Sequence, residues 1–446
     1  MTRLFGTDGV RGVANIELTP ELAFKLGLYG GEIFRKKNNK PVLMGRDNRL
    51  SGDMLKSALA AGFMAAGLDV VDLGIVSTPL VAYLVKENHF SGGAVISASH
   101  NPYEYNGIKL FDEKGFKLTD DEEDEIEKMI KDDYQIERKS KEEIGVLKSG
   151  EELVRQYEDY LISLSPEGLK GFKIAIDCGN GALYKIAPKV LEEMGAEVVS
   201  IYTKPDGKNI NKDCGSTNPK LVSQLVKETN ADFGFSFDGD ADRIIAVDEK
   251  GEEINGDHML GIFAMDLKEQ GKLKNDTVVG TVMTNMGLDV YLDSIESKVI
   301  KAPVGDRYVL ESMVKGDYLI GGEQSGHIIF LEHNTTGDGL ATGIHLANAI
   351  KKSGKVPSEL NKLVSDYPQV LINATVENSK KYSYMENEKI KSEIEKIEEE
   401  FGKTGRVVIR PSGTEPLVRV MIEGKDQEEI TKVAKDLADL IEAELK

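Results

Sequence analysis

The chain has 446 residues, of which 40% are hydrophobic and 30% charged, and its formal net charge is −20. A chain of this length exceeds what one hydrophobic core holds, so two to four domains are expected. The acidic balance argues against a nucleic-acid partner, which needs a basic surface. Any phosphate that this chain binds must therefore be held by local groups of Arg, Lys and backbone N–H.

Cysteine content and the N-terminus indicate the compartment. Cys178 and Cys214 are the only cysteines and do not form a CxxC pair. A disulfide scaffold and a thiolate metal site are both disfavoured, and a reducing compartment fits best. The opening MTRLFGTDGVRG lacks the apolar segment of a secretory signal, and no stretch reaches the roughly 20 apolar residues that span a bilayer. We expect a cytoplasmic protein without a membrane partner.

Strand-like apolar runs alternate with amphipathic helical patterns through most of the chain, which is typical of α/β layering. In the first segment we expect strands over residues 41–45, 69–73 and 93–97, and helices over residues 52–66, 79–86 and 120–132. The second run begins with FKIAIDCGNGA, a strand that leads into a glycine turn and a helix. Further strands are expected over residues 197–202, 233–237, 277–282, 298–302 and 318–321.

The C-terminal block has a different order of elements. We expect a strand over residues 370–376, a charged helix over 385–401, strands over 407–409 and 417–422, and a helix from residue 427. This order is typical of an α+β domain on a small antiparallel sheet. The sequence predicts an α/β protein with three similar α/β domains with mixed sheets and a smaller C-terminal α+β domain. The expected boundaries are 1–150, 151–255, 256–368 and 369–446.

The first motif with chemical potential is ISASHNPYEYNGIKLF, residues 96–111. Ser99 follows an apolar strand and precedes His-Asn-Pro, so its hydroxyl is expected in a tight turn at the carboxyl end of a strand, where ligand sites of open α/β sheets lie. A plain turn of Ser, Asn and Pro explains the same residues equally well. The GxSxG pattern is absent, which disfavours an acyl-transfer hydrolase. Lys109 is a candidate acid or base, provided that its pKa is lowered.

The second motif is FSFDGDADR, residues 235–243. Asp238, Asp240 and Asp242 place three carboxylates on one loop after a strand, and Mg²⁺ prefers such oxygen ligands. A calcium EF-hand is excluded because Arg243 occupies the sixth loop position, where that loop requires glycine. A solvated acidic turn is the remaining alternative, although three close carboxylates repel one another unless a cation neutralises them.

The third motif, GGEQSGHIIF over residues 321–330, places Glu, Gln, Ser and His between two strands. Its glycines allow the backbone to approach a ligand closely, and its polar groups suit sugar hydroxyls. A hairpin turn with incidental polar residues is the competing interpretation.

The fourth motif, RPSGTEPLVR over residues 410–419, combines hydroxyls and backbone N–H groups with an arginine at each end. Such a group suits a phosphate dianion, whereas its two prolines also fit a simple loop. Two weaker stretches carry Asp8 and Arg11, and Gly305, Asp306 and Arg307. The latter opens an expected helix, whose N-terminus favours an anion.

These four motifs follow one another, one in each predicted domain. The order resembles the α-D-phosphohexomutase superfamily over the whole chain, and SASHNP and DGDADR are its most specific motifs. The opening LFGTDGVRG and the loop GEQSGH are most similar to the phosphoglucosamine mutases. Ala241 departs from that pattern, because glycine is frequent there in the glucosamine enzymes.

The resemblance implies four domains around a central cleft and a role for each motif. Ser99 would carry a phosphoryl group and, with Asp238, Asp240 and Asp242, would bind one Mg²⁺. Further catalytic residues would be His100, Lys109, Arg11 and Arg243. Substrate would be bound by Glu323, Ser325 and His327, together with Gly305 and Asp306. Phosphate would be bound by Arg410, Ser412, Gly413, Thr414 and Arg419.

The implied reaction interconverts glucosamine 6-phosphate and glucosamine 1-phosphate, which would feed amino-sugar nucleotide synthesis. A sugar 1,6-bisphosphate would be both intermediate and activator, and a mobile C-terminal domain would let it reorient. A phosphomannomutase or phosphoglucomutase with the same mechanism is the first alternative, and a sugar-phosphate phosphatase and a non-catalytic sensor are others. Related enzymes suggest a homodimer.

Overall fold

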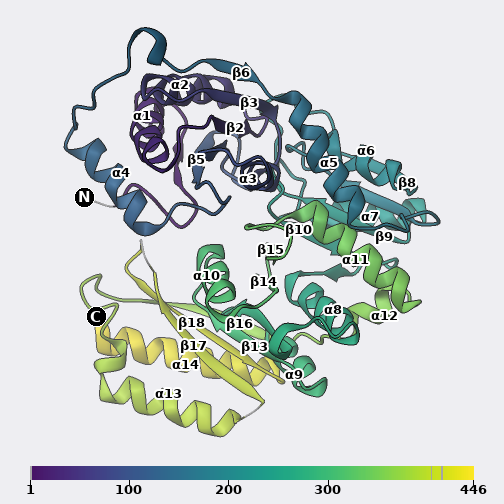
Figure 1. The fold of residues 1–446 in the computed structure, drawn as a ribbon. Helices are drawn as coiled ribbons and strands as arrows, with labels where there is room; N and C mark the ends of the chain where they lie inside the picture. Colours follow the sequence, from purple (N-terminus) through teal and green to yellow (C-terminus); the bar gives the residue numbers. More distant parts are fainter. Residues whose placement is uncertain (1–2, 403, 413–414) are drawn as a thin grey trace. The chain divides into compact units, whose positions relative to one another are not determined.

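The computed structural model describes residues 3–402, 404–412 and 415–446 (Figure 1). The chain divides into two units. Unit 1 consists of Met1–Met283 and Ser297–Leu363, and unit 2 of Thr284–Glu296 and Val364–Lys446. Among the described residues, no helix is both long enough and apolar enough to cross a membrane.

Unit 1 begins with a six-stranded sheet in the order β1-β5-β4-β2-β3-β6. Its strands are β1 (Val10–Val13), β2 (Val42–Arg46), β3 (Val70–Ile75), β4 (Gly92–Ile96), β5 (Tyr105–Phe111) and β6 (Leu147–Ser149). Strands β4, β2, β3 and β6 run parallel, whereas β5 is antiparallel to both β4 and β1. An apolar core joins one face of this sheet to α1 (Pro20–Lys37), α2 (Gly52–Ala65) and α4 (Asp120–Lys131). Helix α3 (Thr78–Glu87) packs its valines against the glycines of β2 and β4 on the other face.

The second sheet of unit 1 has the order β11-β10-β9-β7-β8. Its strands are β7 (Lys173–Asp177), β8 (Glu197–Ile201), β9 (Phe233–Phe237), β10 (Ile244–Val247) and β11 (Glu253–Ile254). Strands β7, β8 and β9 are parallel, and β10 returns antiparallel to β9. The helices of this segment are α5 (Val154–Ser163), α6 (Ile186–Glu193) and α7 (Lys220–Thr229).

The third sheet has the order β13-β12-β14-β15. Its strands are β12 (Thr277–Thr281), β13 (Lys298–Ala302), β14 (Ile320–Gly322) and β15 (Ile328–Phe330). Only β15 runs antiparallel to its neighbour. The associated helices are α8 (Gly256–Glu269), α10 (Asp306–Gly316), α11 (Gly339–Ser353) and α12 (Pro357–Asn361).

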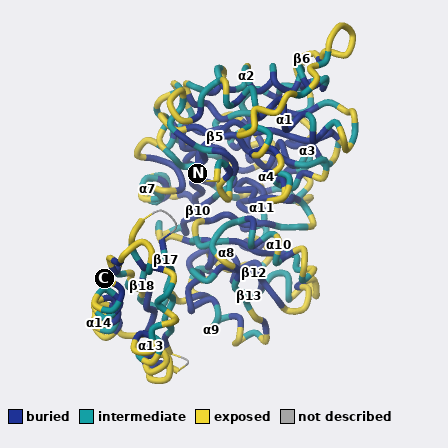
Figure 2. Tube along the Cα trace, turned by 90° about the vertical axis from the view of Figure 1, so that its left-hand side faces the viewer, coloured by how far each residue is buried: buried dark blue, intermediate teal, exposed yellow. Residues whose placement is uncertain are grey.

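Unit 2 contains an antiparallel sheet in the order β16-β18-β17, with β16 (Gln369–Thr375), β17 (Gly405–Pro411) and β18 (Leu417–Gly424). Helices α13 (Glu388–Phe401) and α14 (Gln427–Leu445) pack on it, and the unit also contains α9 (Met286–Ser294). Ile390, Ile394 and Ile397 recur at helical spacing and are buried, while the rest of α13 is mostly exposed (Figure 2). The apolar stripes of these two amphipathic helices thus pack against the buried residues of the sheet and form the core of this unit with them.

The predicted fold class is confirmed: three mixed α/β sheets are followed by a smaller antiparallel α+β part. The expected C-terminal helix over 385–401 begins later, at Glu388, because Asn387 caps it and a short 3₁₀ turn at Tyr384–Glu386 precedes it. The four domain boundaries remain a prediction, since the two units group all three α/β sheets together.

Candidate active site

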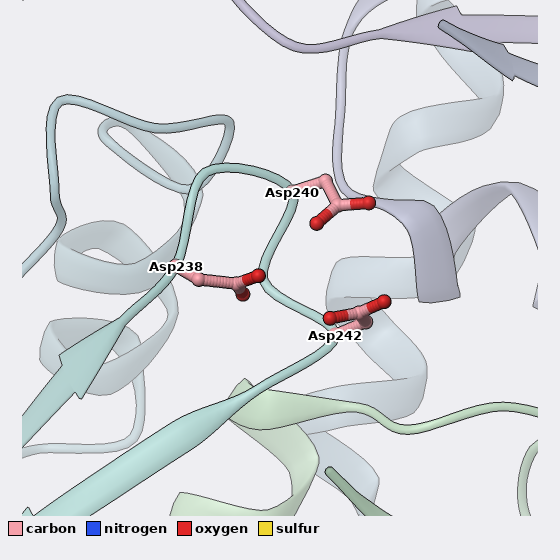
Figure 3. A group of neighbouring side chains, drawn as sticks. All are labelled: Asp238, Asp240 and Asp242. Carbon is pink, nitrogen blue, oxygen red and sulfur yellow. The ribbon is translucent and has the colours of Figure 1, made fainter. Parts of the chain in front are cut away.

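Three buried carboxylates lie on the loop that joins β9 to β10 (Figure 3). Asp238, Asp240 and Asp242 are 1%, 0% and 3% exposed. Each offers one oxygen, and these three oxygens lie within 4.8 Å of one another. The prediction that alternate aspartates converge is therefore met in the geometry of the loop.

The acidic loop (residues 238–243) passes close to the backbone of the serine loop (residues 97–106). A Cβ atom at Gly239 would lie 2.6 Å from the Ser99 carbonyl oxygen, which is too close for any side chain. Ala241 has φ 57°, in the left-handed region that glycine adopts most easily. Ala241 therefore adopts a backbone conformation that glycine would adopt without steric cost.

The carboxylates fit a hard divalent cation. Oδ1 of Asp240 and Oδ1 of Asp242 are buried, and neither accepts a hydrogen bond from the part of the chain that the structure describes. Buried acceptors without partners cost free energy, and a cation that takes several oxygen ligands would remove this cost. The donor set contains oxygen alone, which Mg²⁺ prefers to nitrogen or sulfur.

Ser99 lies beside these three carboxylates. Its hydroxyl donates to Oδ2 of Asp238 over 2.6 Å, and its side chain is buried. The backbone of Ser99 has φ 53°, a left-handed conformation that costs a non-glycine residue about 1–2 kcal/mol. The predicted convergence of the serine with the aspartates is thus present, and it is accompanied by backbone strain.

Lys109 on β5 points into the same group. Its Nζ lies 2.8 Å from Asp240, 3.1 Å from Asp242 and 2.9 Å from Asp8. Burial alone would lower the pKa of Lys109, but these carboxylates outweigh it and raise the pKa well above its usual value. The lowered pKa that a base would require is not found in this arrangement. Lys109 is held as a cation that compensates the carboxylates.

The pKa values of Asp238 and Asp242 are shifted in opposite directions. Burial and the charges of Asp242 and Asp240 raise the pKa of Asp238 well above its usual range. Burial would also raise the pKa of Asp242, but Lys109 and His327 outweigh it and lower that pKa well below its usual range. Negative charge is therefore favoured on Asp242, which faces Lys109, over Asp238.

His100 and two arginines form the adjoining wall. The Nδ1 atom of His100 lies 3.3 Å from the Ser99 hydroxyl and 2.8 Å from an Nη atom of Arg243. Burial, Arg243 and Arg11 lower the pKa of His100 to about 4, so its imidazole is neutral near pH 7. Arg11 itself forms an ion pair with Asp8.

The loop between β14 and β15 carries the expected substrate-binding residues. The Gly305 N–H donates to Oε1 of Glu323 over 3.2 Å, which joins the start of α10 to this loop. Ser325 is exposed at the tip of the loop, whereas His327 is buried.

His327 connects the loop to the carboxylates. Its ring nitrogens lie 3.8 Å from Asp242 and 3.6 Å from Asp306, and its Nε2 accepts the Gly337 N–H at 3.0 Å. Asp306 also pairs with Lys117, which lies 2.5 Å from Asp8. Because the Asp306 carboxylate is engaged within the protein, it does not extend freely toward a ligand.

The fourth motif lies in unit 2. Arg410 on β17 and Arg419 on β18 are directly opposite each other, and Ser412 is buried. Arg419 lies 3.4 Å from Glu415, while Arg410 has no ion pair among the described residues. Two like charges across a strand pair are unfavourable unless an anion lies between them. Gly413 and Thr414, also predicted to bind phosphate, fall outside the described residues.

Sequence reasoning missed the residues that hold these loops in place. Thr78 donates through its hydroxyl to Asp240 over 2.5 Å, and Asn211 donates to the Ser99 carbonyl over 2.9 Å. Arg49 and Asp47 form a buried ion pair behind Ser99. An arginine and an aspartate directly after the apolar strand β2 were a visible signal, because charged residues are almost never fully buried unless paired.

Four family models match the chain in consecutive order. They describe phosphoglucomutase/phosphomannomutase α/β/α domains I, II and III over residues 2–137, 154–251 and 255–367, and the C-terminal domain over residues 371–440. Together they cover most of the chain.

Curated relatives are similar over their full length. A phosphoglucosamine mutase from Alkaliphilus oremlandii is 54% identical over 448 residues, which cover 100% of both chains. One from Thermoanaerobacter sp. is 53% identical over 446 residues, with the same coverage.

Solved structures share the fold. A phosphoglucomutase/phosphomannomutase family protein from Burkholderia thailandensis superposes with a TM-score of 0.84 at 24% identity and covers 99% of this chain and 98% of its own. An Aspergillus fumigatus N-acetylphosphoglucosamine mutase, solved with GlcNAc-6P and magnesium, gives 0.70 at 17% identity, with 99% and 96% covered. With the full-length identity to the curated relatives, these findings establish that the chain belongs to the phosphoglucosamine mutases of the phosphoglucomutase/phosphomannomutase family.

Proposed function

We propose that the chain interconverts glucosamine 6-phosphate and glucosamine 1-phosphate, with Ser99 as the phosphoryl carrier. One observation supports the carrier role above others: a strained, buried serine places its hydroxyl 2.6 Å from the first of three convergent carboxylates. Backbone strain of this kind clusters at functional sites. The sugar is proposed from the names of the full-length relatives.

The reaction consists of two phosphoryl transfers. In the first, a sugar hydroxyl oxygen attacks the phosphorus of phospho-Ser99, the bond from phosphorus to Oγ breaks, and the hydroxyl proton passes to a base. The product is the 1,6-bisphosphate. In the second, the Ser99 oxygen attacks the phosphorus of the other phosphate, the bond from that phosphorus to the sugar oxygen breaks, and the sugar oxygen takes back the proton from the base. No phosphate is consumed, and such transfers depend mainly on positioning and charge stabilisation.

We propose Mg²⁺ as the cation that Asp238, Asp240 and Asp242 hold together with Ser99. When bound, it supplies charge stabilisation for the transferred phosphoryl group. Lys109, Arg11 and Arg243 would add positive charge, and His100 would adjoin the Ser99 oxygen. Glu323, Ser325 and His327 are the proposed sugar-binding residues, and Arg410, Ser412 and Arg419 the proposed phosphate-binding residues.

Ser99→Ala is the decisive variant for the carrier role. It should abolish isomerisation of glucosamine 6-phosphate in the presence of trace 1,6-bisphosphate, while ligand binding measured by calorimetry is largely kept. Peptide mass spectrometry should find phosphate on Ser99 in part of the purified wild-type protein. Full activity of Ser99→Ala contradicts the proposal.

A substrate panel tests the sugar. Glucosamine, mannose and glucose 6-phosphates are compared as substrates, with inorganic phosphate release measured in parallel. Preference for mannose or glucose would contradict the glucosamine assignment, and phosphate release at the rate of isomerisation would indicate a phosphatase.

Variants that keep or remove the positive charge of Lys109 distinguish charge stabilisation from proton transfer. Lys109→Arg keeps the cation but cannot accept a proton near pH 7. Activity retained in this variant supports charge stabilisation, and activity lost in Lys109→Arg and Lys109→Met alike supports proton transfer.

We also propose an oligomeric state and a cellular compartment for the protein. We infer a homodimer, which light scattering coupled to gel filtration would test. A reducing cytoplasm suits Cys178 and Cys214, which are both free and buried.

A further inference from the structure

A buried ion pair lies directly behind the serine loop. Asp47 and Arg49 follow β2, and both side chains are 0% exposed. The Arg49 Nε donates to Oδ2 of Asp47 over 2.8 Å, and the Arg49 backbone N–H donates to Oδ1 over 3.1 Å. Since a fully buried charge is tolerated only with complete partners, the remaining donors of Arg49 require acceptors.

Those acceptors are backbone carbonyls of the serine loop. One Nη atom of Arg49 donates to the Ser99 carbonyl over 2.8 Å. The other Nη donates to the carbonyl of Tyr105 over 3.0 Å and to that of Pro102. A single guanidinium therefore joins the two ends of the loop that begins at Ser99 and ends at β5.

The carboxylate of Asp47 reaches the same residue from the other side. Oδ2 of Asp47 accepts the Ser97 hydroxyl at 2.6 Å, and the Ser97 oxygen accepts the Ser99 N–H at 2.9 Å. Both backbone groups of Ser99, its N–H and its carbonyl, are thus connected to one ion pair. Asn211 adds a second donor to the Ser99 carbonyl.

This arrangement accounts for the conformation of Ser99. A serine at φ 53° would relax to a commoner conformation if its peptide groups were free. Relaxation would turn its hydroxyl away from Asp238. Fixing both peptide groups keeps the hydroxyl at the carboxylates without any contact between the ion pair and the reacting oxygen.

We propose that the Asp47–Arg49 pair is a positioning device for Ser99, which holds the phosphoryl-accepting oxygen in its reactive place through the Ser99 backbone. The proposal rests on the carrier role of Ser99 put forward above. Neither residue touches substrate or the reacting atoms in this scheme, so both act through Ser99.

The geometry requires arginine. The guanidinium is planar and reaches Asp47 and three carbonyls at once, whereas a lysine ammonium is a single point with three donors. Arg49→Lys keeps the positive charge and the ion pair with Asp47 but loses the several N–H donors that reach the carbonyls of the serine loop. A displacement of the Ser99 oxygen by about 1 Å would lower the rate roughly 100-fold.

The experiment measures three quantities in full-length Arg49→Lys: kcat and KM for glucosamine 6-phosphate, the single-turnover rate of Ser99 phosphorylation by 1,6-bisphosphate, and the melting temperature. We expect kcat and the phosphorylation rate to fall together, by about 10- to 100-fold, with KM changed less than about threefold.

A control separates positioning from loss of stability. Leu59→Ala removes a fully buried side chain of α2 and should lower the melting temperature while both rates remain near wild type. Equal losses of rate in Leu59→Ala and Arg49→Lys at similar melting temperatures would overturn the proposal. So would wild-type rates in a folded Arg49→Lys.

If Arg49→Lys does not fold, Ser97→Ala tests the positioning role of the Asp47–Arg49 pair instead. It removes one hydroxyl, leaves the Ser99 N–H without its acceptor, and should lower both rates about 3- to 10-fold. Wild-type rates in Ser97→Ala would then overturn the proposal. Ser99→Ala in the same assays keeps the two hypotheses apart: its activity refutes the carrier role, whereas wild-type rates in Ser97→Ala beside an inactive Ser99→Ala refute the positioning role alone.

Discussion

At the scale of single residues, the acidic loop shows how one set of carboxylates is balanced by local cations. Lys109 pairs with Asp240 and Asp242 through one oxygen of each, and the other oxygen of each is left without a hydrogen bond among the described residues. The arrangement thus combines compensation by the protein with spare ligand atoms. Both features would be needed if the ion is to bind reversibly.

Asp240→Asn tests this balance. The amide removes one negative charge from the group and should weaken Mg²⁺ binding at least about tenfold, because Mg²⁺ sites depend on carboxylate charge. Titration calorimetry on chelator-treated protein measures the affinity. Asp266→Asn, at a carboxylate that pairs with Lys352, is the control and should bind normally. Equal affinity in both variants would argue against a cation at this loop.

His345 gives a prediction for the pH dependence of stability. It stacks on Phe330 with ring centroids 4.2 Å apart, and burial lowers its pKa to about 3. In the unfolded chain its pKa is about 6.5, so between these values only the unfolded state takes up the proton. Stability is therefore lost as the pH falls from about 6.5, with a slope of up to roughly 1.4 kcal/mol per pH unit from this residue.

His345→Gln should remove that part of the slope. Urea unfolding near pH 7 and near pH 5 gives the difference in free energy for wild type and variant. His89→Asn, at an exposed histidine, serves as the control and should keep the wild-type slope. An unchanged slope in His345→Gln would show that other groups cause the acid sensitivity.

At the scale of elements, the sequence predicted best where periodicity was strong. Strand β9 and strand β13 have the predicted bounds. Strand β9 is rich in phenylalanine and ends before Asp238, and strand β13 ends before Pro303. Helix α1 was not predicted: its sequence includes LGLYGG, and glycine is a poor helix former. The glycines are explained only by packing, since a Cβ at Gly27 would lie 2.2 Å from the Leu59 carbonyl of α2. Contacts between distant segments of this kind are not visible in a local pattern.

The start of α11 yields a prediction at this scale. Asp338 caps the helix through the Ala341 N–H at 3.1 Å and accepts the buried Tyr157 hydroxyl of α5 at 2.7 Å. Asp338→Ala removes the cap and leaves that hydroxyl without its partner, and it should cost about 3 kcal/mol of unfolding free energy.

Tyr157→Phe isolates the contribution of the hydrogen bond between the Tyr157 hydroxyl and Asp338. It removes the hydroxyl together with its need for a partner and should cost only about 1 kcal/mol by the same denaturant measurement. A loss in Asp338→Ala no larger than in Tyr157→Phe would mean that the helix cap contributes little.

At the scale of the whole molecule, the candidate site residues could be predicted from the sequence, but the residues that hold their loops in place could not. The aspartates and Ser99 lie close after strand ends, where sequence patterns place ligand-binding residues, and Lys109 lies within β5. Arg49, Asn211 and Lys117 act on residues 50 to about 190 positions away in the chain. Their roles depend on which loops meet, and a single sequence carries no direct record of that.

The division into two units predicts separable effects of mutation. Ile441 is buried in the core of unit 2, whereas all three aspartates lie in unit 1. Ile441→Ala should destabilise unit 2 by about 3 kcal/mol and leave Mg²⁺ affinity unchanged. Calorimetric unfolding and titration calorimetry measure the two effects. Weakened Mg²⁺ binding in this variant would show that the units are energetically coupled.

The path of the chain through unit 2 limits how the protein can be shortened. Thr284–Glu296 belongs to that unit although it lies within the sequence of the third sheet, and Asn285 exchanges hydrogen bonds with the backbone of Tyr367. A stop codon after Leu363 would therefore remove the rest of unit 2 and leave α9 in the chain. The apolar residues and backbone groups of α9 would then be exposed to water. Complete removal of unit 2 requires deletion of both of its segments and a new linker in place of the internal one. A gene that is only truncated should therefore yield an aggregation-prone product.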